Sequence, residues 1–374
     1  NHMVSLNRRS FGRAVLGSAA LAGASSLIPG IAPETSALAL AIPRKRLTGA
    51  DMYTATNWRV AGTDLGIPYV LENGSIGYLM GDTFGGPWPE GGDDHRSPVM
   101  LRSASNPGSA EGIVFDSAAK VAGNGRAPEL MYNAHGGMVG GTRELTVIPN
   151  DGISFPETGR QLVSFMSMEN WDDRGADGIF KSGFAGLAYS DNGNDFQRTN
   201  LRWNNSADNK DPFQMWTMQR DGEYVYVFSV RAGRQHGPMM LRRVKWERMF
   251  WPNEYEGWGW NGTDWGWGRP CTPILEERFG EPSVRKLRDG TWAMAYMDYA
   301  RNQLVTRIAD RPDGVWSNPK VQVYGATNWN LYGGFIHPWS ARGFGKLHLI
   351  VSRWSRTPAG VSTAYHIAQY QGTL

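Results

Sequence analysis

The sequence predicts an all-β fold, and within that class a five-bladed β-propeller. Its 374 residues include 47 glycines and 16 tryptophans, a bias toward strands and turns. No window of about fifteen residues repeats its apolar positions with the 3.6-residue period of an amphipathic helix, so few helices are expected. A recurring hairpin is the third observation, and it sets the number of blades.

Hairpins are predicted wherever short apolar segments flank a tight turn. Tyr69 to Leu71 and Ile76 to Met80 flank the turn Glu72-Asn73-Gly74-Ser75. Two later apolar segments follow Asp221-Gly222 and Asp289-Gly290. Asn-Gly and Asp-Gly pairs adopt the positive φ angles that tight hairpin turns require.

These hairpins recur along the chain. They lie near residues 222, 284 and 346, a spacing of roughly 62 residues, and earlier ones near 67 and 162 fit with one longer insertion. A propeller explains the repeat, because each four-stranded blade buries its faces against its neighbours and ring closure protects the edges. A β-sandwich is the alternative, but it does not require so long a period. Residues 189–196 resemble the aspartate-box turn of sialidase-like propellers, for which a structural role is expected.

The chain is predicted to divide into residues 1–39, a cloning remnant and twin-arginine-type signal peptide, and residues 40–374, a single propeller catalytic domain. Arg8 and Arg9 precede a small, apolar run from Ala14 to Ile28, which closes on Ala37-Leu38-Ala39. An amphipathic helix, or a membrane anchor if cleavage fails, is the alternative. The expected protein is secreted or at the cell surface, without stable membrane insertion after cleavage. Cys271 is the single cysteine, so no internal disulfide can form, in agreement with export after folding.

Charge and motifs exclude several functions. The formal net charge is +3, of which the leader contributes all but one unit, so neither nucleic acid nor an acidic membrane is an expected partner. The sequence contains no phosphate-binding Gly-x-x-x-x-Gly-Lys loop and no Gly-x-Ser-x-Gly elbow. His135, His236 and His337 lack zinc-site spacing, so no metal and no cofactor are predicted. A monomer acting on a neutral substrate is expected.

The densest cluster of unusual residues surrounds the first hairpin. Gly62-Thr63-Asp64 begins it, and its second strand ends in Gly81-Asp82-Thr83. Aspartate is depleted in strand interiors, and an antiparallel hairpin brings residues before its first strand beside those after its second. A lone Gly-Asp-Thr is more often a turn cap, but the pair Asp64 and Asp82 is expected to meet near the axis. Two such carboxylates suit glycosidic cleavage, in which one donates a proton while the other attacks or activates water, and their proximity splits their pKa values.

Longer motifs around this hairpin resemble a known family. Three of them lie near the hairpin, at Gly62 to Asp64, Gly81 to Gly85 and Arg96 to Ser103. A fourth lies later in the chain, at Phe279 to Arg285. The mature chain is similar to an actinobacterial five-bladed propeller family of endo-D-arabinanases (glycoside hydrolase family 183, formerly a domain of unknown function). The resemblance implies a catalytic pair at Asp64 and Asp82, acting on the D-arabinan of mycobacterial arabinogalactan and lipoarabinomannan. Pro282 departs from the family pattern, which often has leucine there.

Other residues are predicted to contact substrate. Glu281, by analogy with other five-bladed furanosidases, is a third acid that orients substrate, or alternatively a rim glutamate paired with an arginine such as Arg285. Tryptophans between residues 246 and 267 lie in a glycine-rich stretch, and their flat faces suit sugar stacking, although about half are expected to serve only packing. The predicted substrate-binding residues are Glu281, Asp94, Arg96, His337, Trp329, Trp258 and Trp260.

Three functions remain open from the sequence. The first is an endo-acting hydrolase of α-D-arabinofuranan with Asp64 as nucleophile or base and Asp82 as acid. Close approach across one hairpin favours the carboxylate separation of a retaining enzyme, about 5 to 5.5 Å. The second is a non-catalytic glycan-binding propeller, with the aspartates accepting hydrogen bonds or binding calcium. The third is a furanosidase acting on L-arabinan.

Overall fold

The computed structural model describes residues 39–171, 179–325 and 330–374. The predicted leader, apart from Ala39, and Trp329 lie outside the described residues. Strands dominate the described part, and its helical elements are brief. None of these helices is long and apolar enough to cross a membrane. The helical elements are α1 (Tyr53–Trp58), η2 (Trp246–Arg248) and η3 (Pro252–Glu254).

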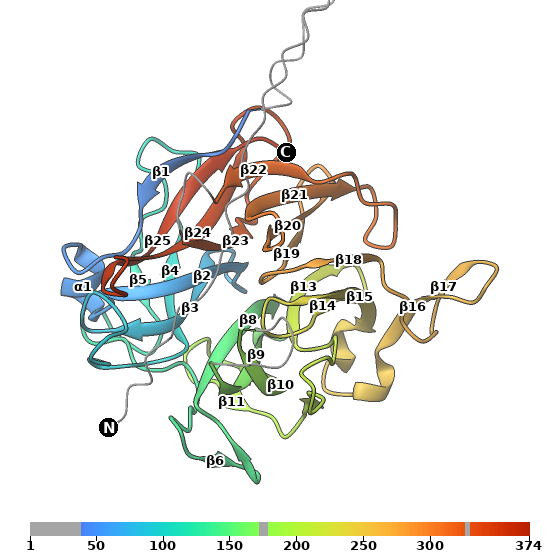
Figure 1. Cartoon of the computed structure of the whole chain (residues 1–374), viewed down its shortest axis with the longest axis horizontal. Helices are drawn as coiled ribbons and strands as arrows, with labels where there is room; N and C mark the ends of the chain where they lie inside the picture. Colours follow the sequence, from blue (N-terminus) through green and yellow to red (C-terminus); the bar gives the residue numbers. More distant parts are fainter. Residues whose placement is uncertain (1–38, 172–178, 326–329) are drawn as a thin grey trace, which may run out of the picture. The chain divides into compact units, whose positions relative to one another are not determined.

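Five antiparallel sheets follow one another around a common centre, which confirms the predicted five-bladed propeller (Figure 1). The inner strands β2, β8, β13, β19 and β23 contact one another in that order, and β23 returns to β2. Blade one contains β2 (Gly62–Val70), β3 (Ile76–Phe84), β4 (Val99–Ser103) and β5 (Ser117–Ala118). Blade two contains β8 (Thr146–Phe155), β9 (Arg160–Asn170), β10 (Lys181–Ser190), β11 (Gln197–Arg198) and β12 (Trp203–Asn204).

Blades three and four continue the ring. Blade three contains β13 (Met215–Asp221), β14 (Tyr224–Val230), β15 (His236–Lys245), β16 (Glu256–Trp260), β17 (Trp265–Trp267) and β18 (Leu275–Arg278). Blade four contains β19 (Ser283–Lys286), β20 (Trp292–Asp298), β21 (Gln303–Ala309) and β22 (Lys320–Tyr324).

Blade five closes the ring with strands from both ends of the described chain. It contains β23 (Leu331–Ile336), β24 (Leu347–Arg356), β25 (Ser362–Gly372) and the early strand β1 (Ile42–Arg46). β1 pairs antiparallel with β25, so that Ile42 lies opposite Gln371. This pairing of the first described strand with the last closes the ring within one blade.

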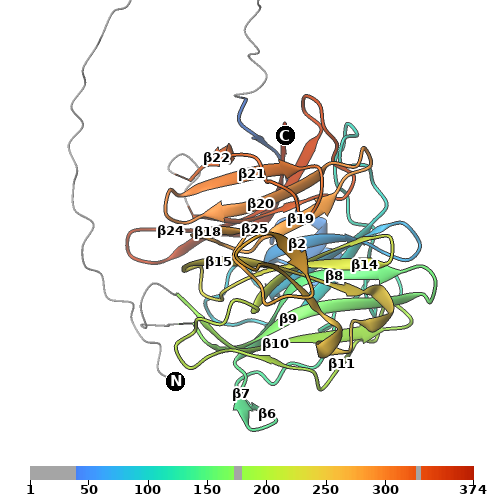
Figure 2. The same ribbon diagram turned by 90° about the vertical axis from the view of Figure 1, so that its right-hand side faces the viewer.

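The predicted long insertion separates blades one and two. It carries a small hairpin, β6 (Met138–Val139) and β7 (Thr142–Arg143), which stands away from the large sheets in both views (Figures 1 and 2). The turn resembling an aspartate box joins β10 to β11, and Asn192 Oδ1 accepts hydrogen bonds from the backbone amides of Asn194 and Asp195. Phe196 is buried below this turn. The turn is thus held by its own side-chain hydrogen bonds and a buried aromatic ring.

A buried ion pair joins four of the five inner strands. Arg285 on β19 donates to both carboxylate oxygens of Asp151 on β8, at 2.7 and 2.9 Å. The same carboxylate accepts from the Thr217 hydroxyl on β13, and the same guanidinium donates to the Pro68 carbonyl on β2. Both charges are almost fully buried and are satisfied by one another and by the surrounding strands.

Candidate active site

A backbone irregularity positions Asp64 at the beginning of the innermost strand. Thr63 pairs with Thr83 and Leu65 pairs with Met80, so the register shifts at Asp64, as in a β-bulge. Leu65 has a φ angle of 66°, in the left-handed region that leucine rarely occupies. Its amide donates to the Ser352 hydroxyl at 2.8 Å. Blade five thus holds the bulge that aims the Asp64 side chain.

Glycine at position 81 makes room for that side chain. A Cβ atom added to Gly81 would lie 2.4 Å from Asp64 Oδ1, well inside van der Waals contact. Gly81 immediately precedes Asp82 on β3, so the hairpin brings both aspartates to the same end of blade one. The structure therefore brings together the two acids predicted from sequence.

The Asp64 carboxyl lies in an environment that favours its protonated form. Burial, followed by the negative charge of Asp82, raises the pKa of Asp64 to about 7, and nearby hydrogen-bond donors offset only part of this rise. The Tyr332 hydroxyl donates to Asp64 Oδ2 at 3.0 Å. Asp64 Oδ1 is buried and has no hydrogen-bond partner among the described residues. Such an atom is available to a ligand.

Asp82 has a different partner. His95 Nε2 lies 2.6 Å from Asp82 Oδ1, and both side chains keep partial access to solvent, 26% for His95 and 20% for Asp82. Burial alone would lower the pKa of His95, but the hydrogen bond and charge of Asp82, with Glu129 and Asp64, raise it above its usual value. The short contact with Asp82 thus favours the charged form of the His95 ring.

Glu281 is connected to Asp64 through two intermediate side chains. Arg234, in the turn between β14 and β15, donates to Glu281 Oε1 at 2.8 Å. Its guanidinium lies 4.8 Å from the ring centre of Tyr332, the tyrosine that donates to Asp64. Glu281 is 8% exposed, and its Oε2 has no hydrogen-bond partner in the described part of the chain. Glu281 pairs with Arg234, whereas Arg285 binds Asp151, so the expected pair of Glu281 with Arg285 is wrong.

Two other predicted substrate-binding residues, Asp94 and Arg96, organise loops. Arg96 is 1% exposed and donates to backbone carbonyls of Asp94, Ala127 and Arg59. Asp94 forms ion pairs with Arg59 at 2.8 Å and Arg126 at 2.7 Å. These contacts fix the loop that carries His95.

The remaining predicted contacts lie in other surroundings. His337 is fully buried between the Tyr78 hydroxyl and the Trp339 amide, and burial lowers its pKa to about 3. Because the His337 ring is fully buried, a ligand cannot reach it. Trp258 and Trp260 lie on the hairpin β16–β17 at the outer rim of blade three (Figure 1). Trp260 is 46% exposed.

One pocket lies apart from the two aspartates. Its volume is about 800 Å³, and it lies between the β6–β7 hairpin and β10–β11, with Tyr132, Phe184 and Arg198 in its lining. Neither Asp64 nor Asp82 contributes to it.

Residues absent from the sequence-based set complete the site. His95, Tyr332, Tyr365 and Arg234 surround the two aspartates, and Tyr332 approaches Asp64 across 268 residues of sequence. His95 had a signal in the sequence, because it stands between the predicted residues Asp94 and Arg96. Together, one shielded and one ion-paired carboxyl can perform acid and base chemistry at the same bond.

Comparisons with known proteins agree with this fold. A protein-family model described as "Domain of unknown function (DUF4185)" matches residues 49–371. The "Notoamide biosynthesis cluster protein J'" of Aspergillus versicolor is 51% identical over 91% of this chain and 95% of its own length.

Solved structures share the architecture at low sequence identity. A protein from Bacteroides ovatus, provisionally assigned as a hydrolase, has a TM-score of 0.55 at 14% identity, covering 84% of this chain and 86% of its own. The catalytic domain of a GH62 α-L-arabinofuranosidase from Coprinopsis cinerea has a TM-score of 0.50 at 11% identity, covering 90% and 98%. These similarities establish the propeller fold.

Proposed function

This chain belongs to the family described as a domain of unknown function (DUF4185), and we propose that it is a glycoside hydrolase that cleaves α-D-arabinofuranosyl linkages within mycobacterial-type arabinan. The observation that carries the proposal is the pair Asp64 and Asp82, adjacent on one hairpin yet held in unlike environments. Paired carboxyls of unlike protonation are what glycosidic cleavage uses. The D-arabinan substrate and the endo mode come from the family resemblance in the sequence.

The environments assign the two roles. Asp64, with its pKa raised to about 7, is the acid that protonates the leaving oxygen. Asp82, ion-paired with His95, is the base or nucleophile. This assignment reverses the one expected from sequence, which had no information on the buried partners. Retention of anomeric configuration stays a prediction from the hairpin geometry.

Glu281 is assigned to substrate binding. Its unpartnered Oε2 is buried within the network that leads through Arg234 to Tyr332 and Asp64. A buried acceptor without a donor is costly, and a sugar hydroxyl would satisfy it. The experiment that tests the proposal is digestion of purified mycobacterial arabinogalactan and lipoarabinomannan, with fragment sizing and NMR analysis of the product anomer.

Each outcome of this digestion has a distinct meaning. Oligosaccharides of several sugars support endo cleavage, whereas release of monosaccharide alone would indicate exo action. Cleavage of L-arabinan in place of D-arabinan would move the specificity to the other furanoside. If wild-type protein binds arabinan without cleaving it and Asp82→Asn binds it more weakly, the protein is a glycan-binding propeller.

A second candidate function follows from one relative. The 51% identical Aspergillus protein is named for a notoamide biosynthesis cluster, which favours a substrate from such a cluster over a polysaccharide. The same acid and base pair would then act on a small compound. Turnover of arabinan that is lost in Asp64→Asn and Asp82→Asn would exclude this candidate as the main activity. Intact arabinan after prolonged incubation would favour it.

A further inference from the structure

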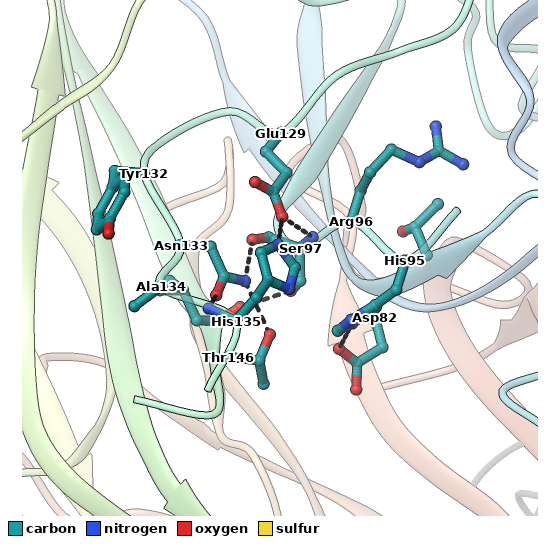
Figure 3. Close-up of polar contacts among 12 residues, drawn as sticks. Asp82, His95, Arg96, Ser97, Glu129, Tyr132, Asn133, Ala134, His135 and Thr146 are labelled. Carbon is teal, nitrogen blue, oxygen red and sulfur yellow. Dashed lines mark hydrogen bonds and ion pairs between the residues drawn. The ribbon is translucent and has the colours of Figure 1, made fainter. Parts of the chain in front are cut away.

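Four titratable side chains form a line that begins with Asp82 (Figure 3). His95 contacts Asp82, His135 contacts His95, and Glu129 contacts His135. The last two come from the loop between blades one and two, which lies outside the hairpin that carries the aspartates. The function proposed above uses His95 only as the partner of Asp82 and gives no role to His135 or Glu129.

The geometry fixes the His95 ring on several sides. Its face stacks on Phe84 with ring centres 5.0 Å apart and an interplanar angle of 17°. The His135 ring meets it edge to face, at 5.1 Å and 82°. At its Nε2 edge lies Asp82 Oδ1, at 2.6 Å. An imidazole confined in this way has one orientation.

The outer pair is fixed in turn. Glu129 Oε1 binds His135 Nε2 and also accepts the backbone amide of Ser97, two residues after His95, at 3.2 Å. The His135 amide donates to Asn133 Oδ1 at 2.9 Å, and Asn133 donates to the Ser97 carbonyl and the Thr146 hydroxyl. The loop of His135 is thereby bonded to the segment of His95 at several points (Figure 3).

We propose that His95 is a positioning residue that holds Asp82 through one carboxylate oxygen, and that the Glu129–His135 pair holds His95 in place. This inference rests on the proposed function of Asp82. Because His95 engages Oδ1, the second oxygen of Asp82 is the one presented to the substrate. A preorganised donor of this kind orients the reacting group before the substrate arrives.

The charges around His95 explain why the support is built from two ion pairs. The titratable groups that face it are Asp82, Asp64, Glu129 and His135. Each of the two rings in contact has its own carboxylate partner, Asp82 for His95 and Glu129 for His135. Neutralising either carboxylate should therefore weaken the hold of His95 on Asp82.

The first experiment is independent of turnover. NMR titration of histidine-labelled protein should show that the pKa of His95 falls in Asp82→Asn, and falls by a smaller amount in Glu129→Gln, relative to wild type. An unchanged pKa of His95 in Asp82→Asn would overturn the proposal. This readout applies even if the substrate is not arabinan.

The second experiment measures kinetics on arabinan. His95→Phe keeps the stack on Phe84 but removes the hydrogen bond, and should lower kcat on the order of 10-fold to 100-fold with little change in KM. The acid limb of its pH profile should move to higher pH, because the carboxylate has lost its hydrogen-bond partner. His95→Gln retains a donor and should recover part of the loss, which also covers the case in which His95→Phe does not fold.

His236→Phe is the matched control, because His236 is exposed at the start of β15 and lies outside this network. It should match wild type. If His95→Phe and His95→Gln keep wild-type kcat and an unmoved acid limb in an active enzyme, the positioning role is wrong while the proposed function stands. If wild type cleaves no arabinan, the proposed function has failed, and the titration alone decides the hold of His95 on Asp82.

Discussion

Two aspartates, the fully buried Asp151 and the half-buried Asp64, lie on neighbouring inner strands of the same ring. Asp151 accepts hydrogen bonds from Arg285, the Thr217 hydroxyl and the amides of Gly152 and Met218, at 2.7 to 2.9 Å. Among the described residues, Asp64 is served only by tyrosine hydroxyls: Tyr332 donates to its Oδ2 at 3.0 Å, and Tyr365 also lowers its pKa by hydrogen bonding.

The difference distinguishes a carboxylate that holds strands together from one that is suited to take part in a reaction. At Asp151 every partner is already in place, so the charge is retained and the strands are held. At Asp64 the partners are too few to stabilise the charge, so the proton is retained near neutral pH. A protein that leaves an acid so poorly satisfied loses stability there, which suits a site completed by a ligand.

The largest expected effect is on chemistry at the poorly satisfied acid and its neighbour. Asp64→Asn and Asp82→Asn should each lower kcat on arabinan by about 10²- to 10⁴-fold, the usual contribution of an acid or base. Steady-state assays on purified variants measure this. Both variants should keep the wild-type circular dichroism spectrum, and cleavage at wild-type rate by either one would contradict the assignment.

The next effect is on stability at the fully satisfied ion pair. Arg285→Met should lower the free energy of unfolding by about 3 to 5 kcal/mol, because it leaves the Asp151 charge buried and unpaired. Denaturant unfolding measures the change. The control is Arg160→Met, since the pair of Arg160 with Asp191 is largely exposed and should contribute no more than about 1 kcal/mol. Equal losses in the two variants would refute the comparison.

A third change displaces the Asp64 carboxyl without altering its chemistry. Gly81→Ala places a methyl group against Asp64 Oδ1 and should lower kcat by up to about 100-fold through misplacement. Gly86→Ala is the control, because the nearest atom to its added Cβ is 3.6 Å away. If both variants are equally active, a side chain at position 81 does not displace the Asp64 carboxyl.

The smallest effect is a pH dependence of stability. The pKa of Asp64 in the fold is about 7, above its usual value of 3.8, so its contribution is fully present at low pH and is lost as pH rises through 7. Asp64→Asn lacks this loss. Since one pKa unit corresponds to about 1.4 kcal/mol, the variant should gain at least about 1 kcal/mol over wild type between about pH 4 and pH 8. Thermal unfolding of both proteins across this pH range measures the difference. If the stability of Asp64→Asn and of wild type changes equally with pH, the prediction is wrong.

The hairpin and its two aspartates were predictable because their signals are local. The turn at Glu72 to Ser75 and the antiparallel pairing of β2 with β3 determine that Asp64 and Asp82 share one end. The bulge at Leu65 was not predictable, because leucine disfavours a positive φ and a hydrogen bond from a distant blade holds it. Local propensity contains no information on that partner.

The roles of the aspartates depended on contacts across the ring. Tyr332 and Arg234 reach the site from blades five and three, and no pattern in the sequence predicts which arginine meets Glu281. The tryptophan-rich stretch shows the converse. Its composition suits sugar stacking, but pairing of β16 with β15 places Trp258 and Trp260 at the outer rim of a blade.

The pairing of β1 with β25 also sets the order in which the molecule can mature. The strand at Ile42–Arg46 emerges during synthesis more than 300 residues before its partner at Ser362–Gly372. The ring therefore closes only after β25 has been translated, and a product truncated before Ser362 would lack Tyr365 and its contacts in the site. A circular permutant would join the two ends and open the chain elsewhere. In such a protein β1 and β25 would pair as neighbours in the sequence.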